Sequence, residues 1–140
     1  MFSGCKSLKA APALPATELA QNCYCLMFFN CKNLTTAPDL SATTLVNYCY
    51  DQMFCNSIKL SSITILAPNT EISTKFPDTA SNWLKNTGTD TSVTSRTLKV
   101  KDKETYQALV DKGLPENRKI DKCTVLDENG NEIVVDSGAE

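Results

Sequence analysis

The chain has 140 residues, enough for one domain or two very small ones, and a net charge of -2 at neutral pH. It is 41% hydrophobic and 21% charged, as expected of a globular protein, and its slight acidity argues against a dedicated nucleic-acid-binding protein. The sequence contains no histidine, which excludes a Ser-His-Asp triad, a Cys-His dyad and an HExxH zinc site. We therefore expect a globular protein that is not an enzyme, binds no nucleic acid and does not insert into a membrane.

A repeat of 26 residues fills the first part of the chain. The dipeptide Met-Phe begins at Met1, Met27 and Met53, and residues 1–26 and 27–52 are identical at 13 of 26 positions without a gap. The identical positions are mostly apolar and the variable ones mostly polar, which is typical of stacked units that bury their apolar sides against one another. The repeat therefore predicts an α/β solenoid of short units.

Each unit is expected to combine a short strand with a short helix. Residues 60–65 are rich in β-branched side chains and predict a strand. The matching residues 8–12 and 34–38 end in a proline, so we expect them to be extended but poorly paired beyond it. The apolar side chains of residues 49–54 fall on one stripe, which predicts one or two turns of helix.

The chain changes character after the repeat. Asp78 or Thr79 can cap a short helix that presents Trp83, the only tryptophan. We expect Trp83 to be a core or cap residue that covers the end of the solenoid, with stacking on a ligand as the alternative. Ser or Thr occupies seven of the eleven positions in residues 87–97, which predicts a linker or an exposed segment.

A small α+β segment is expected to follow. Residues 98–100 predict a strand, and Asp102 can cap a helix over residues 103–112 that ends at Gly113. Asn129-Gly130 lies between two apolar runs and predicts a hairpin. The expected division is a solenoid with its C-terminal cap over residues 1–85, a Ser/Thr-rich linker over 86–97 and the strand-helix-hairpin segment over 98–140.

The motif Cys-Tyr-x-x-Met-Phe-x-x-Cys-x-x-Leu-x-x-Ala-Pro-x-Leu, which begins at Cys23, resembles the BspA-like leucine-rich repeats of bacterial surface proteins. The likeness covers about residues 1–84, and residues 60–65 look like the LxxIxI strand of that family. The resemblance implies a right-handed β/α solenoid and a non-enzymatic role in adhesion and protein contact. It also implies an extracellular or cell-surface location for the parent protein.

The start of the chain departs from that family. The sequence begins inside a unit and carries no secretion signal, so we expect a C-terminal fragment of a longer repeat array. A first unit without a polar cap exposes an apolar end, which favours self-association.

Four of the seven cysteines fall in two columns of the repeat, Cys5 with Cys31 and Cys23 with Cys49. We expect buried thiols that act as small hydrophobic side chains, with a disulfide between adjacent units as the alternative in an exported protein. Cys23-x-Cys25 is too closely spaced for a usual zinc site, and the sequence has no Cys-x-x-Cys motif. We therefore expect no metal, no other cofactor and no catalytic residue.

The preferred interpretation is a non-catalytic module that binds a protein or a glycan through its strands. The expected contact positions flank the inward-facing strand residues and are Lys9, Thr35, Thr36, Asp39, Ser61 and Thr64. One alternative is a structural spacer whose specific contact lies in residues 98–140. The other, less favoured, is a cysteine-based redox or metal protein.

Overall fold

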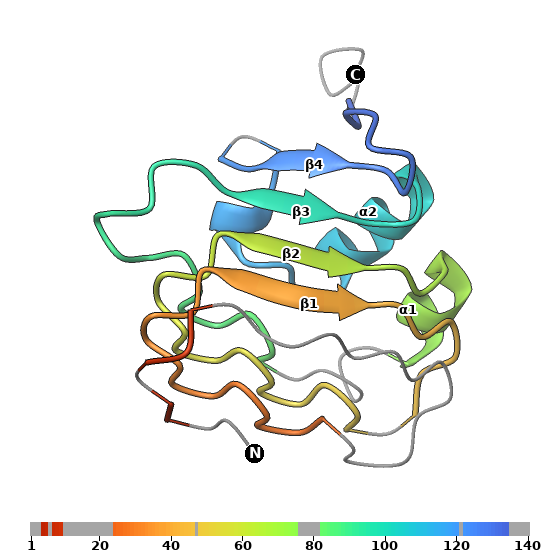
Figure 1. Cartoon of the computed structure of the whole chain (residues 1–140). Coiled ribbons are helices and arrows are strands. Elements are labelled where there is room, and N and C mark those ends of the chain that lie inside the picture. Colours follow the sequence, from red (N-terminus) through yellow and green to blue (C-terminus); the bar gives the residue numbers. More distant parts are fainter. Residues whose placement is uncertain are drawn as a thin grey trace.

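The computed structural model (Figure 1) describes residues 4–5, 7–9, 24–46, 48–75, 82–120 and 122–134. Its elements in chain order are the strand β1 (Thr36–Leu40), the strand β2 (Ser62–Ile65), the helix α1 (Asn69–Lys75), the strand β3 (Thr97–Lys99), the helix α2 (Lys103–Asp111), the 3-10 helix η1 (Glu116–Arg118) and the strand β4 (Thr124–Leu126). The strands form a four-stranded sheet in chain order, and each neighbouring pair is parallel. The expected mixed α/β class is therefore confirmed.

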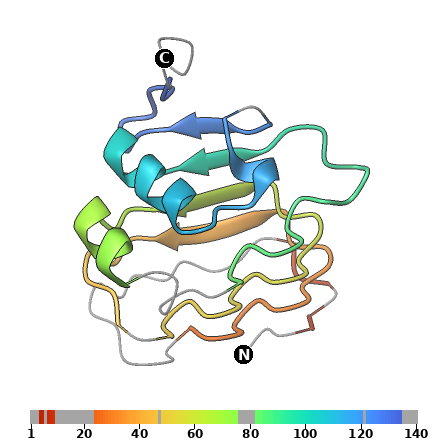
Figure 2. The same ribbon diagram turned by 180° about the vertical axis from the view of Figure 1, so that it is seen from behind.

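One face of the sheet is covered by the core. Ile63, Leu98 and Val125, which are partners in neighbouring strands, are all buried on this face. Helix α2 lies in front of the sheet when the molecule is seen from behind, and α1 packs against α2 (Figure 2). The opposite face of the sheet carries the polar strand residues.

Strand β1 contains a proline and still pairs on both sides of it. Thr36 is the partner of Ser62, and Asp39 and Leu40 are the partners of Thr64 and Ile65, with a shift of register between the two stretches. Pro38 lies at this shift, because its nitrogen has no hydrogen to donate to a ladder. The expectation of poor pairing beyond the proline is therefore wrong for residues 34–38, whereas residues 10–12 of the matching segment lie outside the described residues.

Below the strands in the view of Figure 1, residues 24–30, 48–56 and 82–88 form runs of consecutive turns. The amide of Met27 donates to the carbonyl of Tyr24 in the same run at 3.1 Å, whereas the amide of Phe28 donates to the carbonyl of Met53 in the next run at 2.9 Å. Backbone donors thus alternate between the run itself and the next run. We call this set of hydrogen bonds the turn ladder.

The expected helix over residues 49–54 is wrong, and turns take its place. Tyr48 and Gln52 have φ angles of 59° and 50°, in the left-handed region that a right-handed helix does not contain. The short helix expected to present Trp83 is also replaced by turns, and Asn82 at the start of this run has a left-handed φ of 54°. The proposed caps Asp78 and Thr79 lie outside the described residues.

Aromatic side chains stack in columns between the runs of turns. The rings of Phe28 and Phe54 lie 5.6 Å apart with an interplanar angle of 7°. Tyr50 stacks between Tyr24, at 6.3 Å, and Trp83, at 6.5 Å. Trp83 is buried and therefore continues the core of the repeat.

Helix α1 was not expected from the sequence. Its Glu71 carboxylate accepts hydrogen bonds from the amide of Leu45 at 2.8 Å and from the ammonium of Lys75 at 2.7 Å. Both hydrogen bonds, that from Lys75 above all, hold the pKa of Glu71 below its ordinary value. The helix is thus fastened to the loop after β1.

The segment after residue 97 extends the same sheet. Asp102 caps α2 as expected, accepting a hydrogen bond from the amide of Thr105 at 2.8 Å, and Gly113 follows the helix with a φ of 102°. The predicted hairpin is present as a turn after β4, closed by a hydrogen bond from the amide of Ile133 to the carbonyl of Val125 at 2.7 Å. The sheet therefore continues without a break from the repeat into this segment, and the domain division stays a prediction.

Arg118 is the largest fully buried side chain that the structure describes. Its guanidinium donates to the carbonyls of Leu60 and Ser61, and to the hydroxyl of Thr87 at 3.2 Å. Burial lowers its pKa to about 10, although the neighbouring Cys123 opposes the shift. Gly88 lies against this group, where a Cβ atom would come within 3.0 Å of the guanidinium. Arg118 thus joins η1 to the turn ladder and to the start of β2.

Replacement of Arg118 by Lys is expected to lower the free energy of unfolding by about 3 kcal/mol, because an ammonium cannot reach all three acceptors from the same position. Arg96→Lys is the matched control, since the Arg96 side chain donates one hydrogen bond, to the carbonyl of Gly88 at 2.9 Å. We expect a loss below about 1 kcal/mol for the control. Urea denaturation measures both changes, and equal losses would contradict the role given to Arg118.

The left-handed positions of the turn ladder give a second prediction. Tyr48 has an unfavourable left-handed backbone, and because its side chain is 46% exposed, little stabilising burial offsets that cost. Asparagine tolerates this backbone better, so Tyr48→Asn is expected to raise the free energy of unfolding by about 1 kcal/mol. Asn82→Ala, at another exposed left-handed position, is expected to lower it by about 1 kcal/mol. Thermal denaturation of both variants would contradict the assignment if the two shifts had the same sign.

Candidate functional site

The solvent side of the sheet carries two rows of polar side chains across the strands. The first row consists of hydroxyl-bearing residues that are successive register partners, namely Thr36, Ser62, Thr97 and Thr124. The second row consists of the polar residues Asp39, Thr64 and Lys99 and ends in the apolar Leu126. We call these two rows the outward sheet face.

A third line of polar residues precedes the strands. The amide and the hydroxyl of Thr35 both donate to the carbonyl of Lys9, at 2.9 and 3.1 Å. The amide and the hydroxyl of Ser61 donate in the same way to the carbonyl of Thr35, at 2.9 and 3.1 Å. Equivalent residues of three successive units are therefore joined, each 26 residues from the next.

The structure brings the six expected contact residues together. Thr36, Asp39 and Thr64 lie on the outward sheet face, and Lys9, Thr35 and Ser61 lie in the line that precedes it. Lys9, Thr35, Thr36 and Asp39 are exposed, whereas Ser61 and Thr64 are half-buried. Their role in binding stays a prediction.

Sequence reasoning missed the partners of these residues in the other strands. The sequence predicts Ser62 only as part of a strand, and it places Thr97, Lys99 and Thr124 in a linker and a separate tail. A common pattern could have found them, since Ser62, Thr97 and Thr124 each directly precede an apolar strand residue, Ile63, Leu98 and Val125.

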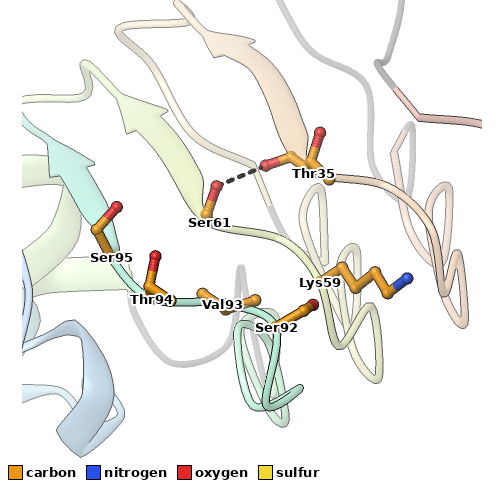
Figure 3. Close-up of a pocket in the computed structure, with 7 residues that line it drawn as sticks. All are labelled: Thr35, Lys59, Ser61, Ser92, Val93, Thr94 and Ser95. Carbon is orange, nitrogen blue, oxygen red and sulfur yellow. Dashed lines mark hydrogen bonds between the residues drawn. The ribbon is translucent and has the colours of Figure 1, made fainter.

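A hollow of about 190 Å³ opens beside the line that precedes the strands (Figure 3). It is lined by Thr35, Lys59, Ser61, Ser92, Val93, Thr94 and Ser95. In the view of Figure 3 the hydroxyls of Thr35, Ser61, Thr94 and Ser95 point to the same side. We call this hollow the hydroxyl pocket.

The loop over residues 90–95 forms one wall of the hydroxyl pocket. The amide of Asp90 donates to the carbonyl of Ile58 at 3.0 Å, which fastens the loop to the preceding unit. The Asp90 carboxylate in turn accepts hydrogen bonds from the hydroxyl and the amide of Ser92, and these hold its pKa below the ordinary value. The loop therefore has a defined shape although it is rich in Ser and Thr.

Lys59 is the one charged residue among those that line the hydroxyl pocket. Its ammonium donates to the side-chain carbonyl of Asn33 at 3.3 Å, which leaves further hydrogens for a ligand. Asp90 interacts with Lys59, but two of its hydrogen bonds come from Ser92. The pocket thus offers one cation and five hydroxyls.

A wider groove of about 510 Å³ lies between α1 and α2. Its lining includes Ser73 and Gln107, and it mixes acidic residues with one lysine. None of the expected contact residues lies in it, so it serves as a control surface for the outward sheet face.

Cysteines of the repeat lie at positions that stack from one unit to the next. Cys31 is buried, and the equivalent position of the next unit is Ser57, whose hydroxyl accepts a hydrogen bond from the amide of Cys31 at 3.1 Å. Burial raises the pKa of the thiols of Cys31, Cys55 and Cys123. A raised pKa keeps a thiol protonated and weakly nucleophilic, which is the opposite of what a redox catalyst needs. Cys23 lies outside the described residues.

Within the described part of the chain, no group of three or more Cys, Asp or Glu residues is arranged to hold a metal ion. The longer of the two described α-helices, α2, has nine residues, and no helix in the described part of the chain is long and apolar enough to cross a bilayer.

Comparison with models of protein families, with curated proteins and with solved structures found no match.

The thiol of Cys25 gives a prediction on reactivity. It is half-buried and donates a hydrogen bond to the carboxylate of Asp51 at 3.8 Å, and burial, followed by the charge of Asp51, raises its pKa. Asp51→Asn is therefore expected to speed the reaction of Cys25 with an aromatic disulfide reagent at pH 8 by about two- to fivefold.

The reaction rate of Cys25 is obtained by subtracting the rate measured with the Cys25→Ser substitution from the rate measured without it, in the native chain and in Asp51→Asn. An unchanged rate in Asp51→Asn would contradict the effect of the carboxylate. A Cys25 that already reacts rapidly at pH 6 would revive the redox alternative.

Proposed function

We propose that this chain is a non-catalytic binding module, built as a short right-handed β/α solenoid of 26-residue units, that contacts a protein or a glycan through its outward sheet face. The proposal follows the resemblance to the BspA-like leucine-rich repeats in placing the parent protein on a bacterial cell surface. Self-association through the first unit belongs to the same proposal.

The solenoid part of the proposal is supported by contacts between equivalent residues of successive units. Side chains 26 residues apart are hydrogen-bonded at several places, including Lys59 with Asn33 and Ser61 with Thr35. The strands follow one another through the sheet in chain order and in parallel, and parallel crossovers of this kind are right-handed in almost all proteins.

The binding part of the proposal is carried by one observation, the row formed by Thr36, Ser62, Thr97 and Thr124. These four residues are register partners across the whole sheet, and no described helix covers their side of it. Threonine and serine hydroxyls both donate and accept hydrogen bonds, so such a row suits a ligand with many polar groups. Extended surfaces of repeat proteins are commonly used for contact.

The non-catalytic part of the proposal is supported by the chemistry of the chain. The sequence has no histidine, and the pKa shifts of the buried thiols run upward. Nucleophilic catalysis by a cysteine would require a lowered thiol pKa.

The experiment that tests the proposal measures binding of the full chain to a glycan array of mucin-type and plant cell-wall oligosaccharides and to a panel of purified extracellular-matrix proteins. The double variant Thr36→Arg/Thr124→Arg places bulky cations at the two ends of the hydroxyl row. We expect it to lose at least about tenfold in affinity for every probe that the native chain binds.

The matched control is Ser73→Arg/Gln107→Arg, which adds the same charge at exposed positions of the groove between α1 and α2. It is expected to bind as the native chain does. The proposal is overturned if the native chain binds none of the probes, or if the control loses as much affinity as the sheet-face variant.

A further inference from the structure

We infer that the hydroxyl pocket is a subsite for a single sugar ring that carries an acidic group. The inference rests on the proposed function and makes it more specific, because it selects a glycan over a protein and assigns one place on the molecule to one chemical class.

The size of the pocket favours one sugar ring. Its volume of about 190 Å³ is below the roughly 300–1,000 Å³ of pockets that enclose drug-sized ligands. The hydroxyls of Thr35, Ser61, Thr94 and Ser95 all point to one side in the view of Figure 3. A ring that enters from this side can leave the rest of its oligosaccharide outside.

The hydrogen-bonding groups of the pocket complement a polyhydroxylated ligand. The hydroxyls of Thr35 and Ser61 already donate to carbonyls of the preceding unit, at 3.1 Å each, so they face the pocket as acceptors. Thr94 and Ser95, which are exposed, can donate as well as accept. Val93 supplies an apolar contact for the C–H groups of a sugar ring.

The charge of the pocket selects an acidic sugar. Lys59 is the one charged residue of the lining. Its ammonium extends away from Thr94 and Ser95 (Figure 3), donates to Asn33 at 3.3 Å and also interacts with the carboxylate of Asp90. An ammonium and an anionic substituent form a charge-assisted hydrogen bond, which is stronger than a bond between neutral groups.

The pocket also adjoins the proposed contact surface. Thr35 and Ser61 directly precede Thr36 and Ser62, the first two members of the hydroxyl row. A glycan whose acidic residue lies in the pocket can therefore continue across the outward sheet face.

The inference is tested by NMR titration of the full chain, following the backbone amides of Ser61, Ser92, Thr94 and Ser95. The probes are glucuronate, glucose 6-sulfate, glucose and inorganic sulfate. We expect glucuronate, glucose 6-sulfate or both to shift these amides saturably, with an affinity at least about fivefold higher than that of glucose or of inorganic sulfate. The two acidic sugars tell whether a carboxylate or a sulfate is preferred.

Lys59→Gln is expected to abolish the advantage of the acidic sugars over glucose, and Lys59→Arg to keep it. Lys122→Gln removes an exposed lysine that does not line the pocket and is expected to change nothing. The inference is overturned if glucose or sulfate binds as well as the acidic sugars, if no probe shifts these amides, or if Lys59→Gln has no effect. If Thr36→Arg/Thr124→Arg still loses binding, any of these results overturns the inference about the pocket and leaves the proposed function in place. If the experiment with that double variant contradicts the proposed function, the inference about the pocket is overturned with it.

Discussion

The fold depends on the division of backbone donors between each unit and the next. The amides of Tyr24, Leu26, Phe28 and Asn30 donate to carbonyls of the following run of turns, while those of Met27 and Phe29 close turns of their own run. Phe54 and Asn56 donate in the same way to the carbonyls of Trp83 and Lys85. Each run of turns therefore depends on the next one for the acceptors of these amides, which would be costly to leave unpaired inside the folded chain.

This constraint explains which side chains the units share. Stacked positions bring like groups together, as in the aromatic pairs Phe28–Phe54 and Tyr24–Tyr50. It also explains the asparagines of the turn ladder, since Asn30, Asn56 and Asn86 have φ angles between 60° and 65°, a region that asparagine tolerates better than most residues. Positions that face solvent are free of this constraint, and there the chain places the hydroxyls of the outward sheet face.

The part of the fold that repeats could be predicted from the sequence. A period of 26 residues and the apolar columns indicate stacked units, and the strand at β2 follows a local rule. Outside the repeat, the cap at Asp102 and the turn after β4 also follow local rules. The turns over residues 48–56 could not be distinguished from a helix, because both place Tyr50 and Phe54 on one side, and only the left-handed φ angles of Tyr48 and Gln52 separate them. Tyrosine and glutamine at these two positions do not indicate a left-handed backbone, as glycine or asparagine would.

The contacts that lie outside the repeat could not be predicted. Arg118 reaches the carbonyls of Leu60 and Ser61, more than fifty residues away, and no local pattern marks it as buried. The pairing of β3 with β2 and β4 likewise depends on the sheet that the repeat begins, and Thr36 is the one member of the hydroxyl row that the sequence predicts as a contact residue. The hydroxyl pocket combines residues from three segments and has no sequence signature.

Native-state hydrogen exchange followed by NMR tests the turn ladder most directly. If the ladder and the sheet form one cooperative structure, the amides of Phe28, Asn30 and Phe54 exchange with the same free energy of opening as those of Thr97 and Val100 in the sheet. Exchange of the three turn-ladder amides at the rate of an unstructured peptide, with Thr97 and Val100 still protected, would contradict the stacking of the units.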